Sequence, residues 1–296
     1  MEIVGDKYRL KELIGQGGMA SVFRAWDLQK NRFVALKKVH SHLSSHGEIR
    51  GRFHFEAKVI SEINHKNIVK FLDYSGENTN DLWIVMELLE GSDLVDYIDR
   101  SHKGYLSSLH SILILNDVAE ALKEVHKKNI IHRDIKPENI MVLHNSEIKL
   151  MDFGIAKDIH LGNLTQVGDF LGSPNYMSPE QIRGTELDKK SDIYSLGVLL
   201  YRMLTGELPF DGYSHHELCM KILLGDYIAP NEISPGMNPI LLRIVTRCLA
   251  LKTHQRYQSV DELLSDIRDY LVLSQDKYFR EKSRTVLRRN NSKQRA

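Results

Sequence analysis

The sequence lacks long apolar runs, has few cysteines and has almost no net charge. No segment comes near the roughly 18 to 20 apolar residues that cross a membrane as a helix, and the start, MEIVGDKYRL, has no basic stretch followed by an apolar one. Cys219 and Cys248 lie far apart in the sequence and neither has a Cys neighbour at metal-ligand spacing, so they predict neither a disulfide framework nor a zinc site. Lys plus Arg total 40 against 39 Asp plus Glu, which gives no general attraction to nucleic acid. We therefore expect a cytoplasmic protein in a reducing compartment.

The chain has 296 residues, 42% of them hydrophobic, which is enough for one large domain or for two lobes that share a cleft. Its N-terminal part holds short runs rich in β-branched and aromatic residues, which predict strands. These runs are YRLKELIGQG, ASVFRAWD, FVALKKV, KFLDY and LWIVMEL. Between them, Phe53, Ala57 and Ile60 fall at helical spacing, so a helix from Glu48 to Asn64 is expected to pack on the strands.

The pattern becomes helical from about residue 92 onward. Two apolar stripes at helical spacing are Ile112, Leu115, Ala119, Leu122 and Val125, and Ile193, Leu196, Leu200, Met203 and Leu204. Gly206 and Pro209 are expected to end the second helix. The sequence therefore predicts an α+β chain with a sheet-rich N-lobe (about 1–87) and a helical C-lobe (about 92–272).

The last segment, 273–296, holds eight lysines and arginines against two acidic residues. With few apolar residues, it is predicted to be a basic, disordered tail. A solvated linker is the favoured interpretation, and a salt-sensitive contact with nucleic acid or an anionic membrane is the alternative.

Three glycines lie in the expected turn between the first two long strands. Gly15, Gly17 and Gly18 lie in GQGGMASV, where the missing Cβ atoms let the backbone close over phosphate groups. A dinucleotide-binding loop opens a helix, whereas this loop joins two strands. By itself the pattern suits an ordinary hairpin better than a nucleotide site, and both interpretations stay open.

One lysine is expected to face inward in the strand that contains VALK. Ala35 and Lys37 share a face of this strand because side chains alternate. Glu56 shares the apolar side of the expected helix with Phe53 and Ile60. Burying either charge alone would be costly, so Lys37 and Glu56 are expected to pair with each other or with a ligand anion. In the alternative, both side chains reach solvent.

The most specific pattern is IHRDIKPEN at 131–139, followed by DFG at 152–154. It brings together four polar groups, Asp134, Lys136, Asn139 and Asp152. Phosphoryl transfer from a metal nucleotide requires a carboxylate that orients the attacking hydroxyl, oxygen ligands for Mg²⁺ and a cation for the developing charge. The pattern therefore predicts this chemistry.

Taken in order, these segments resemble the eukaryotic-like (Hanks-type) bacterial serine/threonine protein kinases over roughly residues 8–272. The resemblance implies the protein-kinase-like bilobal fold. Its N-lobe would hold a five-stranded antiparallel sheet with one helix, and its C-lobe would be mainly helical. Residues 1–272 would form the catalytic domain.

The same resemblance implies a role for each polar group. Asp134 would be the catalytic base, Lys136 would contact the γ-phosphate, Asn139 and Asp152 would bind Mg²⁺ or Mn²⁺, and Lys37 would hold the α- and β-phosphates with support from Glu56. The adenine of ATP would lie among Ile14, Val22, Ala35, Met86 and Met141 and bond to the backbone of Glu87 and Leu89, with Gly15, Gly17 and Gly18 over the phosphates. Glu180 would pair with Arg256, and Asp192 would hold the backbone of the 131–139 loop.

The resemblance also implies the acceptor. Lys136 and GSPNYMSPE at 172–180 are similar to the serine/threonine branch, so Ser and Thr hydroxyls of proteins, its own included, are the implied acceptors. The GGMA form of the glycine loop is similar to bacterial members. Three positions depart from the family pattern without removing a reacting group: Ala20, Ser173 and Met141.

Regulation by phosphorylation follows from the same comparison. Arg133 is expected to bind an anion on the segment 152–180. Phosphorylated Thr165 is the predicted anion, and the fixed carboxylate of Asp169 is the alternative. Ser173 is grouped with them as a regulatory position.

Two other function classes fit the sequence less well. An inactive scaffold would have lost Lys37, Asp134 or Asp152, and a small-molecule phosphotransferase generally lacks the segment that ends in SPE. The expected partners are protein substrates and a second copy of the chain that it phosphorylates in trans. The alternative to a cytoplasmic enzyme is the cytoplasmic part of a membrane-anchored kinase.

Overall fold

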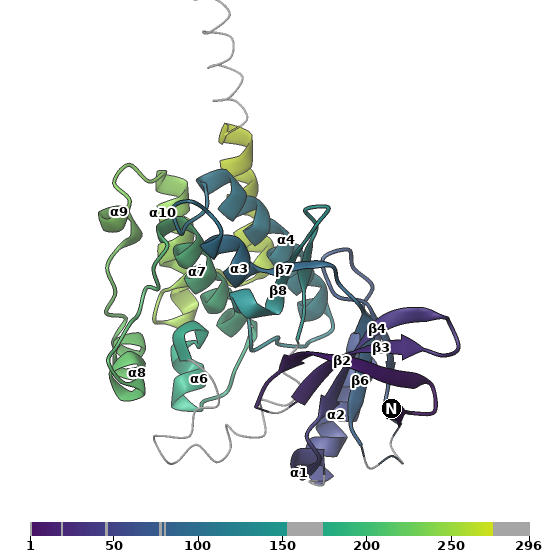
Figure 1. The fold of residues 1–296 in the computed structure, drawn as a ribbon. Helices are drawn as coiled ribbons and strands as arrows, with labels where there is room; N and C mark the ends of the chain where they lie inside the picture. Colours follow the sequence, from purple (N-terminus) through teal and green to yellow (C-terminus); the bar gives the residue numbers. More distant parts are fainter. Residues whose placement is uncertain are drawn as a thin grey trace, which may run out of the picture.

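The computed structural model describes residues 2–18, 20–44, 47–76, 79, 81–152 and 174–274, without the side chains of residues 47–49, 52, 55 and 56. Figure 1 shows two lobes, a twisted sheet with its helices at the lower right and a helical body above and to the left. Most of the predicted basic tail, from residue 275 onward, lies outside the described residues.

The N-lobe is built on a six-stranded antiparallel sheet with the order β1-β2-β3-β4-β6-β5. The strands are β1 (Ile3–Val4), β2 (Tyr8–Gln16), β3 (Ala20–Asp27), β4 (Arg32–Val39), β5 (Phe71–Tyr74) and β6 (Trp83–Glu87). The five predicted strands are present, but the prediction of five strands in total was wrong by one. Strand β1 pairs with β2 over only two residues, too few to show an alternating pattern.

Helix α2 (Gly47–Ser61) lies close to the predicted Glu48–Asn64, and its Phe53, Ala57 and Ile60 are buried as expected. A four-residue helix α1 (Ser41–Ser44) precedes it, so the prediction of a single N-lobe helix was also incomplete. Such a short turn of helix has no room for an apolar repeat.

The C-lobe is organised around α7, whose apolar stripe is buried. Asp188 caps its N-terminus by accepting a hydrogen bond from Lys190 N, and Gly206, with φ of 81°, ends it where the sequence predicted. The elements of this lobe are β7 (Gly91–Asp93), α3 (Leu94–Asp99), α4 (Ser108–Lys127), η1 (Pro137–Asn139), β8 (Ile140–Leu143), β9 (Ile148–Leu150), η2 (Pro174–Tyr176), α6 (Pro179–Arg183), α7 (Lys189–Thr205), α8 (His215–Leu224), α9 (Pro230–Ile233), α10 (Pro239–Cys248), η3 (Thr253–Gln255) and a final helical stretch at 260–274. In the described part of the chain, no helix combines the length and hydrophobicity needed to cross a bilayer.

The largest apolar core runs through both lobes. It joins Ile60 of α2 and Ile84 of β6 to the buried faces of α4 and α7. A second core, which includes Trp83 and Val85, lies on the other face of β6, because successive side chains of a strand point to opposite faces. The N-lobe sheet is therefore covered on both faces.

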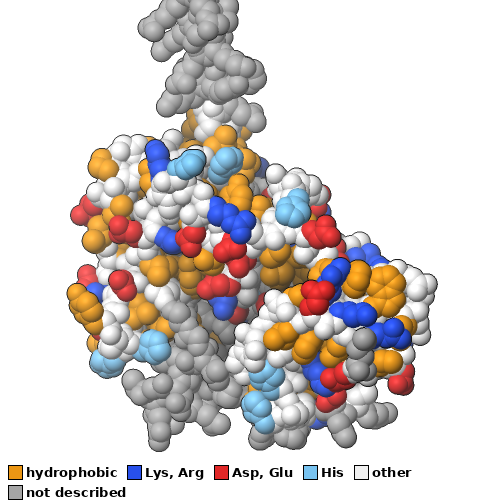
Figure 2. All heavy atoms as spheres, viewed as in Figure 1, with side chains coloured by type: hydrophobic (Ala, Val, Ile, Leu, Met, Phe, Trp, Pro, Cys, Tyr) orange, Lys and Arg blue, Asp and Glu red, His pale blue; other side chains and the backbone are white. Residues whose placement is uncertain are grey.

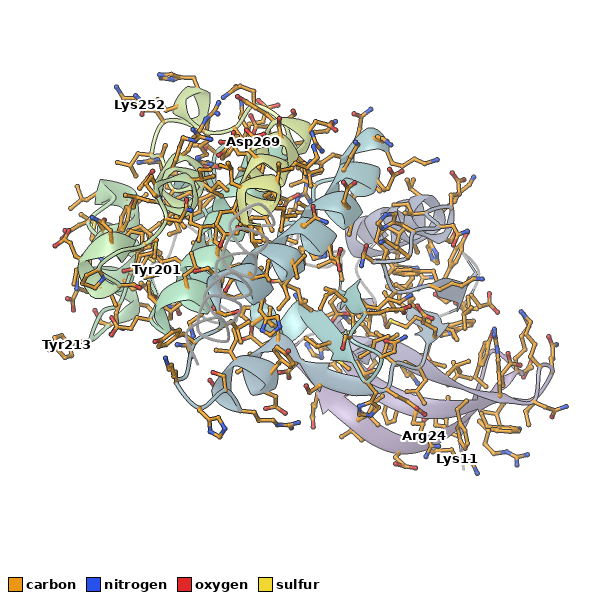
Figure 3. All side chains as sticks on the ribbon, turned by 90° about the horizontal axis from the view of Figure 1, so that it is seen from above. Lys11, Arg24, Tyr201, Tyr213, Lys252 and Asp269 are labelled. Carbon is orange, nitrogen blue, oxygen red and sulfur yellow. The ribbon has the colours of Figure 1, made fainter. Side chains whose placement is uncertain are left out.

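Individual aromatic residues lie in very different environments. Figure 2 shows Lys and Arg grouped with apolar side chains on the N-lobe. In this lobe, the guanidinium carbon of Arg24 lies 3.7 Å from the centre of the Phe33 ring. In the C-lobe, Figure 3 shows Tyr213 at the edge, and it is fully exposed, whereas Tyr201 is buried and donates its hydroxyl to Ile228 O.

Replacing Gly91 with alanine is expected to destabilise the protein. Gly91 begins β7, and a Cβ atom there would lie 2.2 Å from Val142 O of β8, so the two strands would have to separate. Overpacking of this kind costs about 1–3 kcal/mol, which thermal denaturation would record as a lower Tm. The control Gly51→Ala lies in α2, where the added Cβ meets nothing within 4 Å, and its Tm should be unchanged or higher. Equal Tm values for the two variants would contradict this account.

Candidate active site

A buried carboxylate from α7 holds the segment that follows α4. Oδ1 of Asp192 accepts a hydrogen bond from Arg133 N (2.8 Å), and Oδ2 accepts from His132 N (2.9 Å) and from Nε2 of His126 (2.8 Å). Burial alone would raise the pKa of Asp192, but its hydrogen bonds and its electrostatic interaction with His126 together outweigh burial and lower this pKa, so the carboxylate stays ionised. The predicted role of Asp192 in holding this backbone is confirmed.

Three of the four polar groups of the predicted chemistry, Asp134, Lys136 and Asn139, lie on this held segment, and the fourth, Asp152, lies two residues after β9. Nδ2 of Asn139 donates to Oδ2 of Asp134 (2.9 Å) and to its backbone oxygen (2.7 Å). Nζ of Lys136 lies 3.6 Å from Oδ2 of Asp134. Both bonds from Asn139 use its amide nitrogen, so its amide oxygen remains to contact a cation.

Lys37 and Asp152 meet across the boundary between the lobes. Nζ of Lys37 donates to Oδ1 of Asp152 at 2.7 Å. In the sheet, Lys37 lies between Val22 of β3 and Ile84 of β6. The side chain of Glu56, the partner expected from the sequence, lies outside the described residues. Asp152 has φ of 49°, a left-handed conformation that is uncommon for a residue with a Cβ atom.

A small apolar cluster lies beside this ion pair. Its buried members are Ala35, Val69 and Met86, and Val22, Phe71, Leu88, Leu89 and Met151 pack against it. The cluster contains four residues of the predicted adenine site: Val22, Ala35, Met86 and Leu89. Its other four members, Val69, Phe71, Leu88 and Met151, were not predicted from the sequence. Ile14 is 47% exposed and Met141 lies in β8, and neither belongs to this cluster of described residues.

The glycine loop is a tight strand-to-strand turn, as the sequence predicted. Gly15 pairs with Val22, and Gly17 N donates to Ala20 O at 2.9 Å. Because β2 and β3 continue directly into β4, the turn belongs to the same sheet as Lys37.

The donor set suits a magnesium nucleotide better than a metal held by protein alone. Within the described residues, no group of three or more His, Cys, Asp or Glu side chains could hold a metal ion. Mg²⁺ needs only one or two protein oxygens when phosphate groups and water complete its shell. The carboxylate of Asp152 and the amide oxygen of Asn139 fit that requirement.

Helix α6 is tied both to the 131–139 loop and to the far side of the C-lobe. Nε2 of Gln181 donates to Arg133 O at 3.0 Å. The carboxylate of Glu180 accepts two bonds from the guanidinium of Arg256, at 2.7 and 2.9 Å, which confirms the expected pair. Burial would raise the pKa of Glu180, but the bonds and charge of Arg256 lower it below the usual range.

Sequence reasoning missed several of these contacts. His126 and Gln181 support the 131–139 loop from different helices, and no spacing rule links them to it. Three predicted regulatory residues, Thr165, Asp169 and Ser173, lie outside the described residues. Arg133 is described, with φ of 65° and both backbone polar groups hydrogen-bonded.

His132 is completely buried and links the loop to the strand that leads to Asp152. Asp134 N donates to its Nδ1 (3.4 Å), so Nε2 carries the proton and donates to Met151 O (3.0 Å). Burial lowers the pKa of His132 below the ordinary value of about 6.5. The folded protein therefore holds this imidazole neutral.

Lowering the pH is expected to destabilise the protein partly through His132. Its pKa is lower in the folded than in the unfolded chain, so the unfolded chain binds more protons as the pH falls below about 6.5. The Tm of the wild type should fall between about pH 7.5 and 5.5. The Tm of His132→Phe should be lower than that of the wild type at pH 7.5 and should fall less steeply as the pH is lowered. Burial also lowers the pKa of His65, which would contribute the remaining slope. The exposed His144→Phe serves as control, and equal slopes for all three proteins would refute the assignment.

Comparison with known proteins agrees with this geometry. Residues 8–266 match the protein kinase domain family. The chain is 36% identical over 265 residues to the serine/threonine-protein kinase PrkC of Bacillus subtilis, covering 90% of this chain and 40% of the relative. It is 37% identical over 270 residues to the serine/threonine-protein kinase PknB of Mycobacterium tuberculosis, covering 89% and 43%.

The fold is also similar to a solved structure, the kinase domain of Mycobacterium tuberculosis PknI, with a TM-score of 0.72 at 23% identity over 91% of this chain and 97% of that one. The chain spans about two fifths of the length of the curated relatives it matches. The held loop, the ion pair between the lobes and the family match over residues 8–266 lead to one conclusion: this chain belongs to the protein kinase domain family.

Proposed function

We propose that this chain is an active serine/threonine protein kinase that transfers the γ-phosphate of Mg-ATP to Ser and Thr hydroxyls of proteins. The observation on which this mainly rests is the placement of Lys37 against Asp152, 2.7 Å apart, beside Asp134 with its Asn139 and Lys136 contacts. The names of the bacterial relatives support the acceptor type.

Each residue has a task in this proposal. Asp134 orients the acceptor hydroxyl and takes its proton as the oxygen attacks the γ-phosphorus. Lys136, close to the same carboxylate, offsets charge on the transferred group, and Lys37 holds the α- and β-phosphates. Asn139 and Asp152 would hold Mg²⁺, which would offset negative charge on the phosphate groups. The bond from the γ-phosphorus to the bridging oxygen breaks, and its electron pair leaves with ADP.

The nucleotide base would lie against the apolar cluster. Val22, Ala35, Met86 and Leu89 supply this surface, and the backbone of Glu87 and Leu89 would bond to the adenine edge. Ile14, Met141 and the loop glycines complete the proposed site. Glu56 remains the proposed brace for Lys37 once nucleotide phosphates separate Lys37 from Asp152.

Regulation belongs to the same proposal. Thr165 would be phosphorylated, within a transient homodimer, and its phosphate would pair with Arg133. Asp169 is the alternative anion, and Ser173 is a second regulatory hydroxyl. A cytoplasmic location remains a prediction from the sequence.

Asp134→Asn and Lys37→Met should each reduce transfer of phosphate from ATP to a generic basic protein by about a hundredfold or more. The measurement is incorporation of labelled phosphate into Ser and Thr in Mg²⁺ buffer. The matched control is Lys123→Met, which removes the surface ion pair between Lys123 of α4 and Asp261 of the final helical stretch and should retain activity. If the wild type binds ATP but transfers nothing, a scaffold role replaces this proposal.

Incubation with Mg-ATP should add phosphate to Thr165, and Thr165→Ala should lose most of the activation that this incubation produces. Mass spectrometry of the intact protein and its peptides measures the first effect, and initial rates before and after incubation measure the second. Full activity without any phosphate on Thr165 would favour Asp169 as the anion, which Asp169→Asn would then test.

A further inference from the structure

The two lobes are hydrogen-bonded to each other behind the proposed ATP site. We call this contact the interlobe seam; it consists of residues 67–70 from the N-lobe and Ile148–Leu150 (β9) from the C-lobe. Leu150 N donates to Asn67 O (2.8 Å), and Val69 N donates to Leu150 O (3.0 Å). The buried Asn67 side chain donates to Ile148 O at 2.9 Å.

One ion pair connects this seam to the end of β6. Oε1 of Glu87 accepts from Nζ of Lys149 (2.9 Å) and from Lys70 N (2.9 Å). The Lys149 side chain is only 12% exposed and that of Glu87 is 32% exposed, so the pair is screened from water much more than an ordinary surface pair. Glu87 belongs to the N-lobe sheet and Lys149 to β9, so the pair spans the boundary between the lobes.

The position of the pair relates it to both halves of the proposed ATP site. Glu87 is the last residue of β6, next to Leu88 and Leu89 of the apolar cluster. Lys149 is three residues before Asp152, whose carboxylate contacts Lys37. A change in the angle between β6 and β9 would therefore move the adenine surface relative to the phosphate and metal groups.

We propose that Glu87 and Lys149 are positioning residues for ATP, which hold the adenine-binding connection after β6 at a fixed angle to β9. This inference rests on the proposed function. Without Lys149, the Glu87 carboxylate keeps its bond to Lys70 N but loses its contact with the C-lobe. Nucleotide binding would then have to order the lobes as well as fill the site, and that ordering lowers affinity.

The test uses Lys149→Met, which keeps the aliphatic stem, Glu87→Gln, which keeps an oxygen for Lys70 N, and the double variant. Two quantities are measured: the Kd for ADP with Mg²⁺ by titration calorimetry, and KM and kcat for ATP. Each single variant should raise Kd and KM about tenfold, and the double variant should raise them no further, because both changes break one interaction. The kcat of Lys149→Met at saturating ATP should change by less than about twofold, since Lys149 is neither a reacting group nor a group placed against the nucleotide.

Lys7→Met is the matched control. Lys7, in the turn between β1 and β2, also pairs with a carboxylate, that of Asp73 of β5 at 3.1 Å, but both residues belong to the N-lobe, so its loss should leave Kd unchanged. The Tm of every variant is also measured, so that a general loss of stability can be distinguished from a loss of affinity. Wild-type affinity in Lys149→Met, additive effects in the double variant, or a higher kcat at unchanged Kd would each overturn the positioning role. A wild type that binds no nucleotide would instead overturn the proposed function itself.

Discussion

The carboxylate of Asp192 is the group on which the geometry of the site depends most. It is 1% exposed, and an ionised carboxylate in that environment is tolerated only when hydrogen bonds replace its water. Three donors do so, two from the backbone of the 131–139 loop and one from His126 of α4. The loop is thereby attached to two helices through a single side chain. This attachment holds Arg133 in a left-handed conformation, which is costly for a residue with a Cβ atom.

A second buried pair places the helix that follows the undescribed segment 153–173. Arg256 is completely buried and bonds to both oxygens of Glu180, and it also donates to Lys190 O and Ala250 O. Buried ion pairs of this kind add little net stability compared with apolar packing. Their effect is geometric: one guanidinium fixes α6 relative to the start of α7 and the turn after α10. Gln181 then transfers this position to the 131–139 loop.

The elements of the fold could be predicted where short-range pattern determines structure. The apolar stripes of α4 and α7, the inward face of α2 and the glycine that ends α7 are all properties of neighbouring residues. The two-residue strand β1 and the four-residue helix α1 were missed because a pattern needs more residues than they contain. Of the site, the polar groups of the proposed chemistry could be named from HRDIKPEN and DFG, whereas their supports could not. These supports depend on contacts between residues that are far apart in the chain, as for His126, Gln181 and the Glu87–Lys149 pair. The pattern of a single sequence does not indicate which distant residues are in contact.

The apolar core that passes through both lobes has a consequence for how the protein opens. Helix α2 and the inner face of β6 share their core with α4 and α7, while the outer face of the N-lobe sheet is covered by a separate, smaller core. Regions with fewer buried apolar contacts open at a lower free-energy cost than regions packed in a large core. The inner part of the N-lobe is thus coupled in stability to the C-lobe. The outer layer, β1, β2 and β3, packs in the smaller core against one face of β4 and β6 and forms the unit of lower stability. Amide hydrogens in that outer layer would then exchange with solvent through partial openings that leave the rest of the molecule folded.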